Sequence, residues 1–484
     1  MESTYFIKSE SNNTYIMNVH KRSIHLVHPI LYAVMFNLPI EYQDKEKKYY
    51  QRKIQYFIKH GIISYDSIPA KEEYQITGED IKRNIANLSQ LTIEVTEKCN
   101  LKCKYCYYGE YYNMGENREY KDITFDRVNN ILNFLDKRQK SIYNESLDST
   151  LYISFYGGEP LMNMPLISKA VEHSANFNNR KLQFSMTTNG TLLRKKHIEY
   201  LVKHNVRLLI SLDGNEQNNS YRTYSNGKRC YDDILKNIDY IRSLYPLYYE
   251  SNINFNAVLH NKNSVSEIYD FFKKRLNKIP AITELNASGI QENMETEFYL
   301  AYRNFNESLN QSENYDKIES DLFVNVPSYN SVLVFLFQYL WFVFKSYEDL
   351  LAKQSGNEYL STGTCQPFSK KMFITTDGKI LPCEKISHCY SLGQISEDTI
   401  EINTEQIADK HNYYYSKIVR QCHKCYRQNS CSQCFYFIEN LDANPICHGF
   451  MNKNDFMNYL YANINFLEQH HDDYKRMMTE VNII

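Results

Sequence analysis

The twelve cysteines of this 484-residue chain fall into separate groups, and their distribution constrains the fold more than any other feature. The first 98 residues contain none, three lie between positions 99 and 106, Cys230 stands alone, and eight lie between positions 365 and 447. No apolar signal segment follows Met1, so we expect a cytoplasmic protein with reduced thiols. Clustered cysteines in that compartment favour metal or iron–sulfur ligands over disulfides.

Charge and apolar runs narrow the classes of partner. The 55 basic residues are offset by 57 acidic ones, for a net charge of −2, so the composition does not indicate a nucleic-acid-binding surface. The longest apolar run, Val332–Phe344, spans ~20 Å as a helix, which is short of the ~30 Å hydrocarbon layer of a bilayer. We therefore expect a buried helix there, and neither a nucleic-acid nor a membrane partner.

Apolar strands alternate with amphipathic helices through the middle of the chain. Strands are expected at 91–95, 151–155, 182–186, 206–211, 253–259 and 281–285, and helices at 125–135, 166–176, 196–204, 231–244 and 265–276. Repeated strand–helix units predict an α/β domain at 89–290, with a parallel sheet that is open or curled into a partial (β/α)6 TIM-like barrel. Such folds place their chemistry at the carboxyl ends of the strands.

The flanking regions differ from this pattern. Strand signals at 15–19 and 23–27, followed by helices at 29–36 and 49–60, predict a winged-helix-like module at 1–88, with the polar stretch 71–83 as a linker. Residues 291–362 are expected to form a helical bridging segment. From 363 to 484 the chain has many cysteines and short elements, which is typical of a region held together by metal.

The first cysteine group follows the strand at 91–95 directly. Cys99, Cys103 and Cys106 have the spacing C-x3-C-x2-C. Three thiolates on one loop can hold three corners of an iron–sulfur cubane, which leaves one iron with an open position for chemistry. Incidental cysteines and a zinc site with a distant fourth ligand are the alternatives.

With Tyr105 in its aromatic slot, this loop resembles the C-x3-C-x-aromatic-C motif of the radical S-adenosylmethionine (SAM) superfamily. The stretch 156–160, Tyr-Gly-Gly-Glu-Pro, is similar to that family's GGEP motif, and the next two strands end in Thr-Thr-Asn-Gly and Ser-Leu-Asp-Gly. The resemblance implies that SAM is bound by Tyr105, Gly157, Gly158, Glu159, Pro160, Asn189, Ser211, Asp213, Arg222 and Val258. Arg222 matches an arginine that holds the SAM carboxylate in relatives.

The resemblance also implies the reaction class and an electron-donating partner. A [4Fe-4S] cluster binds SAM at its open iron, and an electron from a donor such as flavodoxin or ferredoxin cleaves SAM. The products are methionine and a 5′-deoxyadenosyl radical, which abstracts hydrogen from a substrate. The cofactor carries the difficult step, and the protein supplies orientation and a closed site.

The second cysteine region resembles the SPASM domain, which binds two auxiliary [4Fe-4S] clusters in radical SAM peptide-modifying enzymes. By resemblance, the outer cluster is held by Cys422, Cys425, Cys431 and Cys447, and the inner one by Cys365, Cys383 and Cys434, with Cys389 as the nearest candidate for a fourth ligand. This chain has two residues between Cys431 and Cys434 where the family pattern has three. An inner cluster with an open iron is one alternative, and zinc is another, because His388, His423 and His448 lie close in sequence.

Two further positions bear on the chemistry. Glu384 follows Cys383 at the position where related sulfatase-maturing enzymes have a catalytic aspartate, so the resemblance implies a base; a surface glutamate is the alternative. Cys230 has no neighbouring cysteine and is expected to be a small buried hydrophobe.

The module before the first cysteine suggests the substrate. It resembles the RiPP recognition element, which docks a leader peptide as an added strand at a sheet edge. We therefore expect a maturase that installs a thioether, carbon–carbon cross-link or similar modification in a ribosomally made precursor peptide. The alternatives are an anaerobic sulfatase-maturating enzyme that forms formylglycine, and a non-catalytic iron–sulfur or zinc protein.

Overall fold

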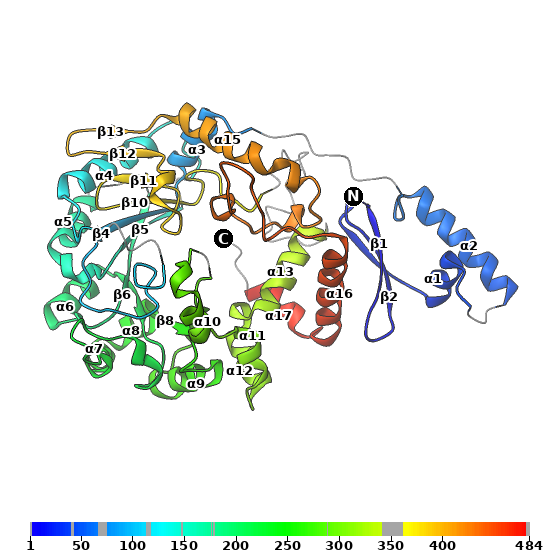
Figure 1. The fold of residues 1–484 in the computed structure, drawn as a ribbon, viewed down its shortest axis with the longest axis horizontal. Helices are drawn as coiled ribbons and strands as arrows, with labels where there is room; N and C mark the ends of the chain where they lie inside the picture. Colours follow the sequence, from blue (N-terminus) through cyan, green and yellow to red (C-terminus); the bar gives the residue numbers. More distant parts are fainter. Residues whose placement is uncertain are drawn as a thin grey trace. The chain divides into compact units, whose positions relative to one another are not determined.

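A computed structural model describes residues 2–39, 43–65, 75–112, 118–146, 149–175, 177, 180–287, 289–340 and 362–480. The chain divides into two compact units (Figure 1). The first comprises Met1–Gln75, Phe323–Thr364 and Tyr414–Ile484, and the second comprises Ile76–Leu322 and Cys365–Tyr413.

The second unit is built on one ten-stranded sheet. Its parallel strands pair in sequence order: β4 (Gln90–Thr96), β5 (Thr150–Gly157), β6 (Lys181–Thr188), β7 (Arg207–Ser211), β8 (Ile253–Leu259) and β9 (Ala281–Glu284). The helices between them are α4 (Phe125–Gln139), α5 (Met164–Ser174), α6 (Lys195–Lys203), α7 (Tyr231–Leu244), α8 (Pro246–Asn252) and α9 (Val265–Phe271). The predicted alternation of strands and helices is confirmed in type and order, except that α8 was not predicted.

The register of the sheet brings the carboxyl ends of its parallel strands together. Thr96 of β4 pairs with Gly157 of β5, and Ser211 of β7 pairs with Asn256 of β8. Along β4, Leu91, Ile93 and Val95 are completely buried, as expected for a strand in the middle of a sheet. Loops that leave these ends therefore meet over one edge of the sheet.

The sheet does not end with the six parallel strands. The strand β10 (Lys371–Ile374) pairs with β4 in parallel, and the antiparallel strands β11 (Lys379–Leu381), β12 (Gly393–Ile395) and β13 (Ile400–Glu401) follow. The sequence pattern did not predict this extension, because strands of two to four residues are too short for a periodic signal. The sheet is therefore mixed rather than wholly parallel.

Two predicted irregular regions contain helices. The polar stretch interpreted as a linker includes part of α3 (Gly78–Ala86), where Thr77 and Asp80 form a capping box and Ile81 and Ile85 are buried. The cysteine-rich region contains the long helices α15 (Thr404–Cys422) and α16 (Lys453–Gln469), so the expectation of short elements alone is wrong there. In α15, the buried Ile407, Tyr415 and Ile418 recur at helical spacing, a signal that the expectation of short elements overlooked.

The first unit begins with a three-stranded sheet, whose second and third strands form the predicted hairpin. Strands β1 (Thr4–Lys8), β2 (Thr14–Asn18) and β3 (Ser23–Val27) form an antiparallel sheet with β3 at an edge, followed by helices α1 (Pro29–Phe36) and α2 (Asp44–Lys59). Ile16, Val27, Leu31 and Ile63 form its small apolar core. The order from β2 to α2 agrees with the expected strands and helices, whereas β1 was not predicted. The winged-helix interpretation stays a prediction.

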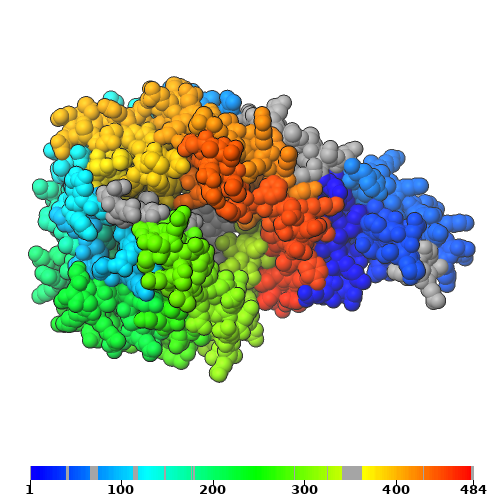
Figure 2. Space-filling view, viewed as in Figure 1, coloured from blue at the N-terminus to red at the C-terminus, as the bar shows by residue number. Residues whose placement is uncertain are grey.

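The N-terminal sheet packs on the C-terminal helices within the same unit. Glu468 of α16 accepts hydrogen bonds from Tyr15 at 2.6 Å and Ser9 at 2.9 Å, and the Tyr5 and Phe456 ring centres are 5.3 Å apart. Figure 2 shows these segments, in blue and red, as adjoining surfaces. The contact with Phe456 helps to bury the Tyr5 ring of β1.

Helices also occupy the described part of the bridging segment. They are α10 (Glu295–Ala301), α11 (Phe305–Asn310), α12 (Tyr315–Leu322) and α13 (Pro327–Tyr339), and α17 (Asp473–Glu480) lies near the C-terminus. The expected buried helix at 332–344 is confirmed as far as Tyr339, and residues 341–361 lie outside the described residues. Within the described residues, we find no helix that is both long and apolar enough to cross a membrane.

Candidate functional site

A cavity of about 740 Å³ lies at the carboxyl ends of the parallel strands in the second unit. Of the predicted site residues, it is lined by Cys99, Cys103, Tyr105, Cys106, Gly157, Gly158, Asn189, Ser211, Arg222 and Val258. These residues come from five strand ends that are far apart in sequence. Glu159, Pro160 and Asp213 are not among the lining residues.

The cysteine loop is held at this edge by backbone hydrogen bonds. The Lys102 amide donates to the Thr223 carbonyl at 2.7 Å, and the Lys104 amide donates to the Tyr221 carbonyl at 3.0 Å. Within the loop, the Cys106 amide donates to the Cys103 carbonyl at 3.1 Å. The loop is therefore a fixed element that is attached to the segment carrying Arg222.

The chemistry of the three thiols fits an iron–sulfur cluster. Burial raises the pKa of the Cys99 thiol to about 11, and burial and the neighbouring thiols raise that of Cys103 further. Within the described residues, no three His, Cys, Asp or Glu side chains converge on a position for a single metal ion. Thiolates that bind different irons of one cluster need not converge in that way. Cys99, Cys103 and Cys106 would hold the cluster and release their protons when it is bound.

The two glycines after β5 are required by the fold itself. Gly157 has φ +144°, and a Cβ atom at this position would lie 2.2 Å from the Thr96 carbonyl oxygen. A Cβ atom at Gly158 would lie 2.2 Å from the Lys98 carbonyl oxygen. The β5 end therefore passes against the backbone that leads into the cysteine loop, which only glycine permits.

The Glu159 carboxylate is occupied by donors of the protein. It accepts hydrogen bonds from the Thr188 hydroxyl at 2.6 Å, the Asn189 amide at 2.7 Å and the Leu161 amide at 3.1 Å. Burial raises its pKa to about 7 against these bonds. Glu159 thus connects the β5 end to the β6 end, and two of its donors, Thr188 and Asn189, line the cavity.

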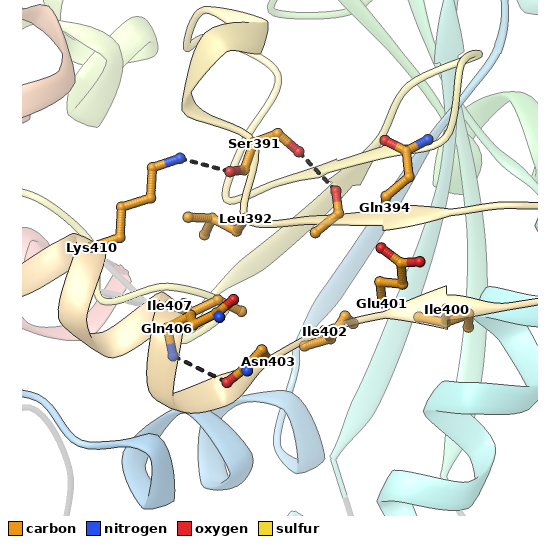
Figure 3. A pocket seen from close by; sticks show the side chains of 11 residues that line it. Ser391, Leu392, Gln394, Ile400, Glu401, Ile402, Asn403, Gln406, Ile407 and Lys410 are labelled. Carbon is orange, nitrogen blue, oxygen red and sulfur yellow. Dashed lines mark hydrogen bonds between the residues drawn. The ribbon is translucent and has the colours of Figure 1, made fainter.

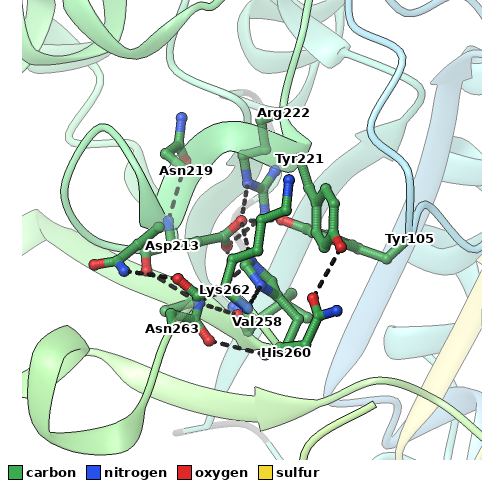
Figure 4. Close-up of polar contacts among 12 residues, drawn as sticks. Tyr105, Asp213, Asn219, Tyr221, Arg222, Val258, His260, Lys262 and Asn263 are labelled. Atoms are coloured by element: carbon green, nitrogen blue, oxygen red, sulfur yellow. Dashed lines mark hydrogen bonds and ion pairs between the residues drawn. The ribbon is translucent and has the colours of Figure 1, made fainter. Parts of the chain in front are cut away.

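Asp213 is also buried and accepts bonds from protein groups on several elements (Figure 4). Arg222 Nε lies 3.1 Å from its Oδ2, the Val258 amide lies 3.0 Å from its Oδ1, and the Tyr105 hydroxyl also donates to Oδ2. Burial alone would raise the Asp213 pKa, but Arg222 and the hydrogen bonds outweigh it and hold the pKa at about 2. The carboxylate is therefore ionised and orients the Arg222 guanidinium.

Sequence reasoning missed His260. Its ring is completely buried, its centre lies 5.7 Å from that of Tyr105, and its Nε2 lies 3.8 Å from Asp213 Oδ2. The available signal was its position, directly after β8, because residues at such strand ends face the chemistry of this fold class.

A second missed group lies under the same cavity. Glu94 of β4 is buried and pairs with Arg118 at 3.0 Å, and the Arg118 guanidinium carbon lies 3.8 Å from the centre of the Tyr108 ring. Arg118 and Tyr108 line the cavity. Burial raises the Glu94 pKa to about 7, although Arg118 and the Thr376 amide oppose this. A charged residue in an otherwise apolar strand was the signal.

Glu384, the predicted base, lies outside the cavity lining and pairs with Lys371. Its influence reaches the cavity through Tyr156, whose pKa is raised by burial first and then by the negative charges of Cys106 and Glu384. The neighbouring Lys385 carbonyl accepts a hydrogen bond from Tyr107 at 3.3 Å. The loop after β11 thus lies beside the cysteine loop, and a catalytic role for Glu384 stays a prediction.

Four of the C-terminal cysteines gather in the first unit. Burial and then Cys431, Cys447 and Cys425 raise the pKa of the Cys422 thiol to about 12. These four are the predicted ligands of the outer cluster. Cys434 belongs to the same unit, whereas Cys365, Cys383 and Cys389 belong to the other, so the predicted inner grouping stays a prediction.

Cys230 is completely buried, as expected for an apolar role. Its thiol donates to the Arg222 carbonyl at 3.3 Å.

Another cavity, of about 700 Å³, lies between β12, β13 and the start of α15 (Figure 3). Lys410 donates to the Ser391 carbonyl at 2.8 Å, and the Gln406 amide donates to Asn403 Oδ1 at 3.1 Å. None of the predicted site residues line it.

Comparison with known proteins finds a family match for the segment that carries the first three cysteines. Residues 93–274 match the model of the Radical SAM superfamily. The chain is 30% identical over 253 residues to the radical SAM cyclopropyl synthase TigE of Paramaledivibacter caminithermalis, a match that covers half of each chain. It is 27% identical over 337 residues to a cysteine-type anaerobic sulfatase-maturating enzyme of Clostridium novyi, covering 65% of this chain and 78% of that enzyme.

A solved structure shares the fold. Native anSMEcpe with bound AdoMet and Kp18Cys peptide aligns with a TM-score of 0.51 and 18% identity, covering 81% of this chain and 99% of that one.

Proposed function

We propose that this chain, an enzyme whose residues 93–274 form a radical SAM domain, modifies a ribosomally made precursor peptide. The observation that carries the proposal is the cavity where three cysteine thiols and the Arg222 guanidinium meet at the strand ends. When bound, a [4Fe-4S] cluster and SAM supply hydrogen-atom abstraction from an unactivated carbon.

The residues of the cavity have distinct tasks in this proposal. Cys99, Cys103 and Cys106 hold the cluster, and Arg222 offers a guanidinium fork to the SAM carboxylate. Asn189 and Ser211 offer hydrogen bonds to the ribose, and Val258 offers an apolar contact to the adenine. Arg222 and Asn189 are buried, which strengthens the polar contacts that they make.

Two observations support a peptide substrate. The Clostridium novyi relative is a sulfatase-maturating enzyme, so it acts on a protein, and the match covers most of that enzyme. The N-terminal sheet also ends in β3, whose outer edge is unpaired within the described residues. An extended leader peptide can add to such an edge as a further strand. We assign the winged-helix-like module to leader binding on this basis.

The C-terminal cysteines serve auxiliary [4Fe-4S] clusters in this proposal. The mutual influence of the thiols at 422, 425, 431 and 447 supports the outer cluster. The inner cluster would use Cys365, Cys383 and Cys434, with Cys389 as a candidate ligand. Reduced flavodoxin or ferredoxin would supply the electron.

Sulfatase maturation is the second candidate, and the Clostridium novyi relative favours it. The two reactions leave different products. A cross-linked peptide loses two hydrogens and keeps its side chains, whereas a matured sulfatase peptide carries a formylglycine aldehyde in place of cysteine or serine.

Anaerobic reconstitution followed by mass spectrometry tests both. The protein should hold about four irons for each cluster and form 5′-deoxyadenosine from SAM when dithionite is added. It should then be given a leader-bearing precursor peptide encoded beside its gene and, separately, a sulfatase-derived peptide. Loss of two hydrogens from the precursor supports the proposal, and an aldehyde on the sulfatase peptide supports the second candidate. Zinc without iron, or no 5′-deoxyadenosine, would exclude both.

A further inference from the structure

The Asp213 carboxylate lies at a junction between three parts of the cavity wall. It follows β7, it receives the Val258 amide from β8, and it pairs with Arg222 through Nε and Nη2 at 3.1 and 3.3 Å. Its side chain is completely buried and does not face the cavity. A carboxylate so occupied orients its neighbours and has little capacity left to bind a ligand itself.

The remaining donor to this carboxylate comes from the cysteine loop. Tyr105 lies between Cys103 and Cys106, and its hydroxyl donates to Asp213 Oδ2, the oxygen that also accepts from Arg222 Nε. The Arg222 guanidinium carbon lies 5.3 Å from the centre of the Tyr105 ring. One carboxylate oxygen thus joins the loop that carries the thiols to the guanidinium (Figure 4).

The surroundings keep this junction dry and rigid. The buried His260 ring stacks on Tyr105, and Tyr221 packs on His260 with ring centres 4.7 Å apart. The Asp213 amide donates a hydrogen bond to Asn219 Oδ1, and Asn263 Nδ2 donates one to the Val258 carbonyl, so both strand ends are fixed. In such a water-poor site, charge-assisted hydrogen bonds are stronger than at the surface.

Backbone pairing alone does not set the direction of the guanidinium. The amides of Lys102 and Lys104 bind the carbonyls of Thr223 and Tyr221, which attaches the two segments but leaves the Arg222 side chain free to rotate. The Asp213 carboxylate removes that freedom, and the Tyr105 hydroxyl makes the carboxylate position depend on the cysteine loop.

We propose that Asp213 is a positioning residue that, through the Tyr105 hydroxyl, fixes the Arg222 guanidinium relative to the three thiols. The cluster and the SAM carboxylate are thereby held in one mutual geometry. This inference rests on the proposed binding of SAM in the cavity.

The test compares the reconstituted full-length protein with the variants Tyr105→Phe, Asp213→Asn and the double variant. Tyr249→Phe is the matched control, because Tyr249 is equally buried and its hydroxyl makes one hydrogen bond, at 2.7 Å to the Leu276 carbonyl, away from the cavity. The readouts are iron content, the dissociation constant for SAM by equilibrium dialysis, and the electron paramagnetic resonance spectrum of the reduced cluster with and without SAM.

We expect Tyr105→Phe to keep its iron and to bind SAM about tenfold more weakly, with Asp213→Asn at least as weak. The double variant should be no weaker than Asp213→Asn alone, because the hydroxyl acts through the carboxylate. The spectral change on SAM addition should be diminished in both single variants and normal in Tyr249→Phe.

The opposite results are also informative. Any of three results would overturn the positioning role. They are a wild-type SAM affinity in Tyr105→Phe, a loss of SAM affinity in the double variant that equals the product of the two single losses, and an equal loss of SAM affinity in Tyr249→Phe. If the iron-loaded wild type itself fails to bind SAM, the proposed function is overturned together with this inference. A wild type that binds SAM beside an unchanged Tyr105→Phe overturns the inference alone.

Discussion

Both carboxylate oxygens of Glu384 lie 3.0 Å from the ammonium nitrogen of Lys371. Lys371 begins β10, so the ion pair anchors the loop after Cys383 to this strand, and β10 in turn pairs with β4, which leads into the cysteine loop. The charge of Glu384 acts on Tyr156, which lines the cavity. Glu384 is therefore placed to exchange a proton with the cavity only through a neighbour or after its ion pair opens.

If Glu384 accepts the substrate proton, Glu384→Gln should form product about a hundredfold more slowly, the usual contribution of a general base. SAM cleavage to 5′-deoxyadenosine should continue, because the thiols and Arg222 are unchanged. Both products can be quantified in one chromatographic run. Glu216→Gln, which breaks an exposed ion pair with Arg229, is the control. Normal product formation in Glu384→Gln would assign Glu384 a structural role.

Cys103→Ala should abolish SAM cleavage and remove about four irons, because a cluster with two protein ligands is not retained. Cys230→Ser is the matched control, since Cys230 is completely buried and a serine hydroxyl can still donate to the Arg222 carbonyl. Iron analysis and 5′-deoxyadenosine formation provide the measurements. Turnover in Cys103→Ala would refute the ligand assignment.

Cys425→Ala should remove about four irons while SAM cleavage persists, because the outer thiols belong to a different unit from the cysteine cavity. The same preparation should be analysed for zinc. Loss of one zinc ion with unchanged iron content would show that these cysteines form a zinc site and not an iron–sulfur cluster. Loss of SAM cleavage together with the iron would show that the outer site is needed for the catalytic one.

The buried Glu94 predicts a pH-dependent stability. Its pKa rises from 4.5 in the unfolded chain to about 7 in the folded protein, so the folded state binds an additional proton between these values. The contribution of Glu94 to the free energy of unfolding is therefore complete below pH 4.5. It falls by about 3 kcal/mol as the pH rises through 7. Glu94→Gln cannot lose a proton and should gain stability relative to the wild type as the pH rises.

Thermal midpoints at about pH 5 and about pH 8 measure this difference. The thermal midpoint of Glu216→Gln, a substitution at an exposed ion pair, should change with pH by the same amount as that of the wild type. A gap between wild type and Glu94→Gln that stays constant over this range would show that Glu94 does not titrate there.

Leu26 tests the leader-binding edge. It lies on β3 with 64% of its surface exposed, and an aspartate there should weaken binding of the leader peptide about tenfold by removing an apolar contact. Leu247→Asp is the control, because Leu247 is 80% exposed on α8. Fluorescence anisotropy of a labelled leader peptide measures both. Equal affinity of Leu26→Asp and wild type would move the binding surface elsewhere.

The sequence by itself determined the alternating α/β core and the position of the first three thiols. Apolar strands of five to eight residues and helices with a regular apolar face show a periodic pattern of apolar residues. This pattern can be recognised in the sequence without knowledge of the fold. The motif residues at strand ends, such as Gly157 and Ser211, then meet at one edge because parallel strands share a direction. Ten of the predicted residues therefore line one cavity.

Only the tertiary structure decided what the buried carboxylates do and where the sheet ends. Glu159 and Asp213 belong to motifs that suggested ligand contacts, but their oxygens accept hydrogen bonds from Thr188 and Tyr105, which are distant in sequence. Asp213 also pairs with the nearby Arg222. The pairing of β10 with β4 likewise joins segments about 280 residues apart. Such contacts depend on long-range packing and hydrogen bonding. The local sequence pattern does not indicate which residue pairs with a buried charge.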